Sequence, residues 1–304
     1  MNISYTQKSC KKTFKPLQEL DLIDAFLFGA STEKTQDAEF IAKLIIERAT
    51  GQKVDKISVV SEKELAGIDI SHHGIRMDLY VEAYENERLA KVFDIEPNKY
   101  NPAELPMRSR YSQSLTDVKL LKAGEPYEEL PEYISIWILP YDPFGKNQMI
   151  YTVKNCVEEC PDVVYNDGVK RLFLYVGGEL GGTEKLKDLL NYFSSSKKGN
   201  VTDADLEHLH SIVENAKNNQ KVGKRYMTLQ DMIDYEKKES YEDGVAMGRS
   251  EGREEGKAEA RKEGILAFVN FAREMKVSND EIANHLMQKF SLSTEEATAY
   301  LNNN

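Results

Sequence analysis

The sequence has few cysteines and no long apolar run. Its three cysteines, Cys10, Cys156 and Cys160, are too few for a disulfide framework, and neither they nor the five histidines show zinc-site spacing. The longest apolar stretches, such as YISIWILP, are far shorter than the roughly 20 residues that span a bilayer. No apolar segment follows the N-terminal lysines, so no signal peptide is predicted. We therefore expect a cytoplasmic protein with reduced thiols and no membrane partner.

An excess of positive charge and the common phosphate-binding loops are also missing. The formal net charge is −11, so nucleic-acid binding would depend on a local basic patch and not on the whole surface. The stretch YVGGELGGTEK follows an apolar strand, but it has neither the P-loop pattern nor G-x-G-x-x-G spacing. We interpret it as a glycine-rich turn.

Helical and strand patterns occur together, which predicts an α/β fold. Helices are expected at residues 17–28, 37–50, 107–124, 184–194 and 202–218. A strand is expected around KISVV. YISIWILPYD has the near-continuous apolar character of a strand buried on both faces, and KRLFLYVGG resembles it.

Residues 74–98, GIRMDLYVEAYENERLAKVFDIEPN, predict a β-hairpin with its turn near Asn86. Strand alternation places Asp78 on one face of the first strand, and Asp94, Glu96 and Asn98 together on one face of the second. Either plausible register brings Asp78 opposite Glu96 or diagonal to it.

Carboxylates that face each other across two strands repel, which raises a pKa or requires a cation. Their hard oxygen ligands suit Mg²⁺ or Mn²⁺, and a metal held there can activate water for attack on a phosphodiester. The sequence therefore predicts a metal site among the carboxylates that face each other in this hairpin. The alternative is an exposed hairpin face with scattered acids, which is common in an acidic protein.

The helix that follows the hairpin begins with Arg108, Arg110, Tyr111 and Gln113. Arg108 and Tyr111 are three residues apart and so share a helix face. Arginines at a helix start beside carboxylates suit the recognition of a DNA phosphate. Salt bridges to the surrounding acids are the alternative.

From residue 239 the composition changes. Residues 248–264, GRSEGREEGKAEARKEG, form a four-residue repeat of glycine, base and acid. Like charges four residues apart repel on a helix, and each glycine weakens it by about 1 kcal/mol relative to alanine. Residues 239–264 are therefore a frayed helix, a helical arm steadied by a partner chain, which makes a homo-oligomer, or a solvated linker. Residues 265–304 predict a small helical module with capping boxes at Ser278 and Ser293.

Taken together, these segments resemble the recombination-promoting nuclease (Rpn) and transposase family of the PD-(D/E)XK nuclease superfamily. The resemblance rests on GIRMDLYVEA, FDIEPN, MRSRYSQSLTDVKLLKAGEPYEEL, ISIWILPYDPFG, YMTL and the glycine-rich tail. It implies that residues 1–238 form a restriction-endonuclease-like core, a mixed central sheet flanked by helices. It also implies Mg²⁺-dependent hydrolysis of DNA, linked to recombination or mobile elements.

The family pattern carries over to specific residues. Asp78 matches the first acid and Glu96 the second, and the family's lysine or glutamine position falls on Asn98. Glu39 is the best match for a glutamate contributed by an early helix. Asparagine carries no charge, and Pro97 before it removes a strand hydrogen bond.

Two hypotheses follow: a Mg²⁺-dependent DNA endonuclease, or a weakened or inactive nuclease fold that acts as a DNA-binding or oligomeric assembly module.

Overall fold

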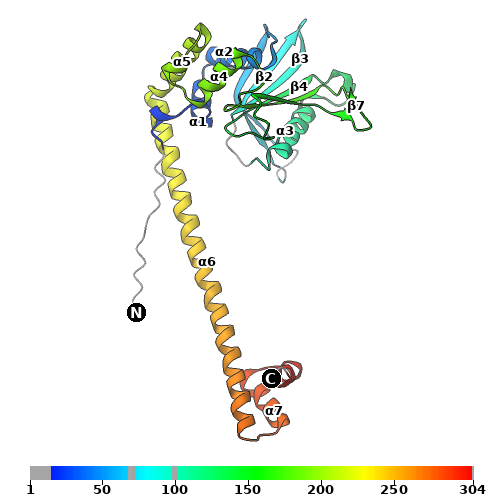
Figure 1. Ribbon diagram of the computed structural model, residues 1–304, viewed down its shortest axis with the longest axis vertical. Helices are drawn as coiled ribbons and strands as arrows, with labels where there is room; N and C mark the ends of the chain where they lie inside the picture. The colour runs from blue at the N-terminus through cyan, green and yellow to red at the C-terminus, as the bar shows by residue number, and fades with distance from the viewer. Residues whose placement is uncertain (1–14, 68–70, 72, 98–101, 303–304) are drawn as a thin grey trace. The chain divides into compact units, whose positions relative to one another are not determined.

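The structure is a computed structural model that describes residues 15–67, 71, 73–97 and 102–302 (Figure 1). The chain divides into two compact units, Met1–Thr228 and Leu229–Asn304. The division falls before residue 239, where the composition changes. In the described part of the chain, no helix is both long enough and apolar enough to cross a bilayer.

The first unit is built on a mixed six-stranded sheet with the order β1-β2-β3-β4-β8-β5. The strands are β1 (Ile57–Leu65), β2 (Ile75–Glu85), β3 (Arg88–Pro97), β4 (Glu132–Leu139), β5 (Ile150–Val153) and β8 (Val169–Tyr175). Strands β1, β2 and β3 are antiparallel, β3, β4 and β8 are parallel, and β5 is antiparallel to β8. The predicted α/β class with a mixed central sheet flanked by helices is confirmed.

The β2–β3 hairpin turns at Asn86 and Glu87, as the sequence predicts. Both residues have positive φ angles, 48° and 64°, as in a two-residue hairpin turn whose twist matches that of the strands. Leu79 pairs with Ile95 and Tyr80 with Asp94. The turn sets Glu85 opposite Arg88, and a register shift between Ala83 and Tyr84 then sets which side chains further along β2 and β3 are neighbours.

Four helices cover one face of the sheet: α1 (Ala25–Ser31), α2 (Thr35–Thr50), α4 (Glu184–Ser194) and α5 (Ala204–Lys217). Their apolar side chains pack with alternate residues of the strands, including Leu79, Ile95 and Ile136, in the largest hydrophobic cluster. Gly51 ends α2 in the left-handed conformation, next to the expected helix end at residue 50. The expected helix at 17–28 is instead a short 3-10 turn, η1 (Leu17–Glu19), followed by α1.

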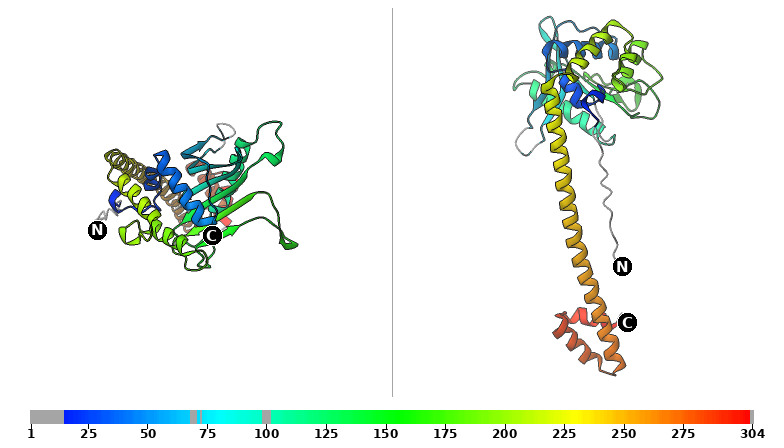
Figure 2. Two further views of the ribbon diagram at one scale, coloured as in Figure 1. Left: turned by 90° about the horizontal axis from the view of Figure 1, so that it is seen from above. Right: turned by 90° about the vertical axis from the view of Figure 1, so that its left-hand side faces the viewer.

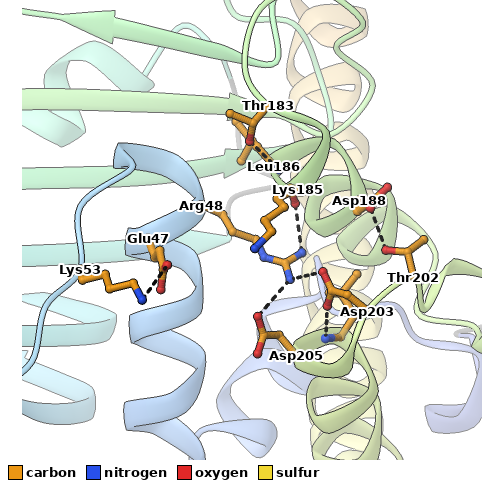
Figure 3. A network of polar contacts seen from close by, with 11 residues as sticks. Glu47, Arg48, Lys53, Thr183, Lys185, Leu186, Asp188, Thr202, Asp203 and Asp205 are labelled. Carbon is orange, nitrogen blue, oxygen red and sulfur yellow. Dashed lines mark hydrogen bonds and ion pairs between the residues drawn. The ribbon is translucent and has the colours of Figure 1, made fainter.

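Arg48 ties three of these helices together (Figure 3). Its side chain is only 3% exposed. Nη1 donates to the carbonyl of Lys185 at 3.0 Å, and Nη2 donates to Asp203 Oδ2 at 2.7 Å and lies 3.6 Å from Asp205 Oδ2. Because a buried guanidinium needs its partners, this network fixes the C-terminal end of α2 against α4 and α5.

Helix α3 (Leu105–Leu120) covers the opposite face (Figure 1). Near its start, Leu105 packs with Trp137 and Phe173, and at its end Leu120 packs against the cluster that includes Tyr80 and Tyr133. Between the two contacts, the buried residues of α3 include Ser109, Ser112 and Thr116. The space between α3 and the sheet is therefore apolar at both ends and partly polar in the middle, next to the acids of β2 and β3.

The remaining elements of this unit are short. They are η2 (Tyr127–Glu129), η3 (Lys198–Asn200) and a two-stranded sheet of β6 (Cys156–Val157) and β7 (Cys160–Val164). Strands β5, β6 and β7 were not expected from the sequence. Both cysteines of the small sheet are free and exposed.

Helix α6 (Gln220–Glu274) begins in the first unit and continues into the second. It includes the four-residue repeat, so this segment is helical and not an irregular linker. Helices α7 (Asn279–Phe290) and α8 (Thr294–Asn302) pack on the C-terminal part of α6 around Ile265, Val269 and Leu286 (Figure 2). Both predicted capping boxes form, at Ser278 with Glu281 and at Ser293 with Glu296.

Candidate active site

The hairpin register brings together the two acids that the sequence singles out. Because Leu79 pairs with Ile95, Asp78 lies across from Glu96. The backbone N–H of Asp78 donates to Glu96 Oε1 at 3.3 Å. Asp78 is half-buried, whereas Glu96 is 4% exposed. The closer of the two predicted arrangements is therefore the observed one.

A third acid, Asp94, lies behind this pair and is fully buried. Its Oδ2 accepts a hydrogen bond from the Tyr133 hydroxyl at 2.9 Å. Within the described part of the chain, its Oδ1 has no hydrogen-bond partner. The sequence placed Asp94 on the same strand face as Glu96 but gave no reason to select it, since its burial depends on β4 and α3.

Burial raises the pKa of each of the three carboxyl groups, and the charge of Asp78 adds to the rise at Asp94 and Glu96. Burial raises the pKa of Asp78 to about 6, while the charges of Arg76 and Arg108 oppose the rise. Burial also raises the pKa of Asp94 to about 7, against the hydrogen bond from Tyr133. For Glu96, burial and the charges of Asp94 and Asp78 raise the pKa well above its ordinary value. The cluster therefore favours either protonation or a bound cation at neutral pH.

Arg108 is the base that approaches this cluster. Its Nη2 lies 3.6 Å from Glu96 Oε2, and the side chain of Arg108 is 40% exposed compared with 5% for Glu96. The guanidinium carbon also lies 5.9 Å from the centre of the Trp137 ring, on the neighbouring strand. Arg108 thus reaches from the buried carboxylate to the solvent at the start of α3, where an anionic ligand can approach it.

The other predicted phosphate contacts occupy different positions on α3. Arg110 is exposed. The Tyr111 hydroxyl donates to the carbonyl of His73. Gln113 donates to Asp117 at 3.2 Å and accepts a hydrogen bond from Arg171 at 2.6 Å. Tyr111 and Gln113 therefore make contacts within the protein, and Arg108 is the residue of this set that contacts the acids.

Glu39 lies half-buried on α2. Among residues 15–67, 71, 73–97 and 102–302, no hydrogen bond or ion pair joins it to Asp78 or Glu96. Its part in a metal site stays a prediction.

Glu62 of β1 is an acid near Asp78 that the sequence analysis missed. Its charge raises the pKa of Asp78. Glu62 has a φ of 51°, and the alternation of side chains along β1 changes there. The Ser61 hydroxyl donates to the carbonyl of Thr32, next to α1. Lys63 instead lies over the Tyr80 ring, on the other face of the sheet. Such an irregularity re-aims a side chain and leaves no clear signal in sequence.

The donor set fits a divalent cation with few protein ligands. In the described residues, no group of three or more carboxylate, imidazole and thiol side chains is arranged to hold a metal ion. Mg²⁺, however, is commonly bound by one or two carboxylates together with water and substrate phosphate. Two apposed carboxyl groups with raised pKa values and the unpaired Asp94 Oδ1 are consistent with such a site. Asn98 lies outside the described residues.

Comparison with protein-family models, with curated proteins and with solved structures gives no match for this chain.

Proposed function

We propose that this protein is a Mg²⁺-dependent DNA endonuclease with a restriction-endonuclease-like core. The observation that supports the proposal most strongly is the carboxyl cluster of Asp78, Asp94 and Glu96 with Arg108 beside it. Buried acids with raised pKa values next to an exposed base are typical of functional sites. The resemblance to the Rpn family assigns Asp78 and Glu96 the same roles.

In the proposed mechanism, Asp78 and Glu96, on adjacent strands, are the residues that would hold the cation. Bound Mg²⁺, or Mn²⁺ in its place, would lower the pKa of a water molecule and offset negative charge on the phosphate. Arg108 contacts a phosphate oxygen, for which its planar guanidinium is suited, and Arg110 extends the basic surface of α3. Tyr133 holds Asp94 in place behind the two ligands.

The proposed partners are DNA and a second copy of the chain. The overall charge of −11 disfavours non-specific binding to DNA. Contact with the phosphodiester would therefore be local and would depend on Arg108 and Arg110 of α3.

A nicking assay tests the proposal directly. Supercoiled plasmid is incubated with the wild type, Asp78→Asn or Glu96→Gln, with Mg²⁺ or with a chelator. We expect Mg²⁺-dependent nicking by the wild type and a loss of at least about 100-fold in both variants, since each removes a metal ligand. Glu85→Gln is the control, because Glu85 is an exposed acid of β2, the strand that also carries Asp78. Equal nicking by the wild type and Asp78→Asn would contradict the assignment.

The second candidate function is a DNA-binding or oligomeric assembly module on an inactive nuclease fold. It is favoured by Pro97, which is the last residue of β3 next to Glu96, and by the long helical arm. DNA binding by the wild type without Mg²⁺- or Mn²⁺-dependent nicking would support this function over the first.

A further inference from the structure

The central part of α6 is a helix with almost no contacts inside its own chain. From residue 231 to residue 264, Ile233 and Val245 are half-buried and the other side chains are exposed. Gly244, Gly248, Gly252, Gly256 and Gly264 share a four-residue spacing, and a Cβ added at any of them would meet no atom within 4 Å. This set, with Ala260 at the missing position, is called the glycine face below.

The sequence of this helix disfavours an isolated helix. Each glycine costs about 1 kcal/mol relative to alanine in a helix interior. The bases Arg249, Arg253 and Lys257 are four residues apart, as are the acids Glu251, Glu255 and Glu259. Each like-charge pair at this spacing costs a few tenths of a kcal/mol. Contacts from another chain would offset these terms.

The charges lie on the two flanks of the glycine face. Each base follows a glycine by one residue, which places it about 100° further around the helix. Each acid follows a glycine by three residues, or about 300°, which places it about 60° from the glycine in the opposite direction. Glycines, bases and acids thus form three parallel rows. The bases are on one side of the glycine face and the acids on the other.

The symmetry of a pair determines which rows meet. In a parallel two-fold pair that places one glycine face against the other, the base row of each copy faces the acid row of its partner on both sides. In an antiparallel two-fold pair, bases face bases and acids face acids. Only the parallel pair is complementary, and like charges across an interface select against the other arrangement.

We propose that the arm between Gly244 and Ala260 is a parallel homodimer interface, in which the glycine faces of two copies pack together and the flanking charge rows pair. Small residues at the contact allow two helix backbones to approach closely. Because a row with a spacing of four shifts by about 40° per step around the helix, the two copies coil around each other with a local crossing angle near −50°, which keeps the rows in contact. This inference deepens the proposal of a second copy as partner. It does not depend on DNA cleavage.

Two bases also make contacts within the chain, and these define the extent of the interface. Arg261 donates to the carbonyl of Phe290 and so takes part in the helical module. Lys257 pairs with Glu254 at 2.8 Å, but both side chains are about two-thirds exposed, and such a pair contributes little. The interface therefore ends near Ala260, where the module begins.

The first test is the mass in solution together with cysteine cross-linking. The full chain at micromolar concentration, without DNA or metal, should have twice the single-chain mass of 34.7 kDa. In a background with all native cysteines replaced by serine, Gly252→Cys should form a disulfide-linked dimer on mild oxidation. Ser250→Cys, two residues away on the outer side of the helix, should not. A single-chain mass, or equal cross-linking at the two positions, would overturn the proposal.

The second test separates close packing from helix stability. Gly252→Leu and Glu254→Leu both introduce a good helix former, and circular dichroism confirms folding. Only Gly252→Leu should return the mass to that of one chain, because it blocks the approach of the glycine faces. Loss of the dimer in both variants or in neither would contradict the interface.

The third test determines the orientation. A charge-swapped variant exchanges the two rows: Arg249, Arg253 and Lys257 become glutamate, and Glu251, Glu255 and Glu259 become lysine. In a parallel pair, the wild type and the swapped variant each self-associate and do not mix. In an antiparallel pair, the mixed dimer is the favoured one. Formation of the mixed dimer alone would overturn the parallel assignment. None of these tests measures DNA cleavage. Failure of the dimer proposal is therefore distinct from failure of the proposed nuclease function.

Discussion

Asp78 donates its backbone N–H to the carboxylate of Glu96, 18 residues later in the chain, across adjacent strands. This contact orients the Glu96 side chain towards β2, with Arg108 on its other oxygen. One carboxylate therefore lies between a second acid and a base.

Trp137 should report cation binding at the acids. It is the only tryptophan of the chain, is fully buried, and pairs with Glu96 in the β3–β4 register. Mn²⁺ should quench its fluorescence in a saturable manner, and Tb³⁺ should show luminescence sensitised by it. The combined variant Asp78→Asn and Glu96→Gln should lose both signals. Retention of both signals in that variant would place the bound cation elsewhere.

Asp94→Asn should change how the stability of the metal-free protein depends on pH. Because burial raises the pKa of Asp94 to about 7, its contribution is fully present below the ordinary carboxyl pKa and is lost as pH rises through about 7. The wild type should therefore lose up to a few kcal/mol of unfolding free energy between about pH 4 and pH 8. Asparagine cannot ionise and still accepts from Tyr133.

Urea denaturation across this pH range checks the prediction. The Asp94→Asn variant should show a smaller pH dependence and higher stability than the wild type at pH 8. Tyr133→Phe is the companion variant, since it removes the hydroxyl that stabilises the Asp94 carboxylate. It should be less stable than the wild type, most clearly at high pH. An identical pH dependence in the wild type and Asp94→Asn would show that Asp94 does not ionise in this range.

Arg108→Gln should weaken DNA binding more than a change at an unrelated arginine. Loss of one phosphate contact is expected to lower affinity for all DNA sequences and to reduce the salt dependence by about one counterion. Fluorescence anisotropy at several salt concentrations measures both quantities. Arg88→Gln is the control, because Arg88 pairs with Glu129 at the far end of β3. Equal effects of the two changes would remove Arg108 from the DNA contact.

Arg48→Met should destabilise the first unit by about 3 kcal/mol or more, because it leaves Asp203 and the Lys185 carbonyl without their buried donor. Arg225→Met, which breaks the exposed pair with Glu33, should change stability by less than about 1 kcal/mol. Denaturation monitored by circular dichroism compares the two. Similar values for both would show that the Arg48 network contributes little to stability.

Local patterns in the sequence determine much of the fold. The period of two in β2 and β3 and the Asn86–Glu87 turn predict the hairpin, which brings Asp78 near Glu96. The register that sets the two acids opposite each other also depends on the shift between Ala83 and Tyr84. Helical periodicity and capping residues predict α2, α4, α5, α7 and α8. These features depend on interactions between residues that are close in sequence or joined by a short turn, and so they can be recognised without the rest of the chain.

Tertiary structure decides the properties that depend on distant segments. Asp94 is buried because Tyr133, 39 residues later, and α3 cover it. The Glu62 irregularity and the Arg48 network depend in the same way on elements far apart in sequence. Sequence alone could not choose between helix and linker for the glycine repeat, because its weak local preferences do not favour either. The sequence by itself thus determined the hairpin and the acids that it brings near one another. The tertiary structure decided their register and their burial, because both depend on contacts between elements that no local pattern links.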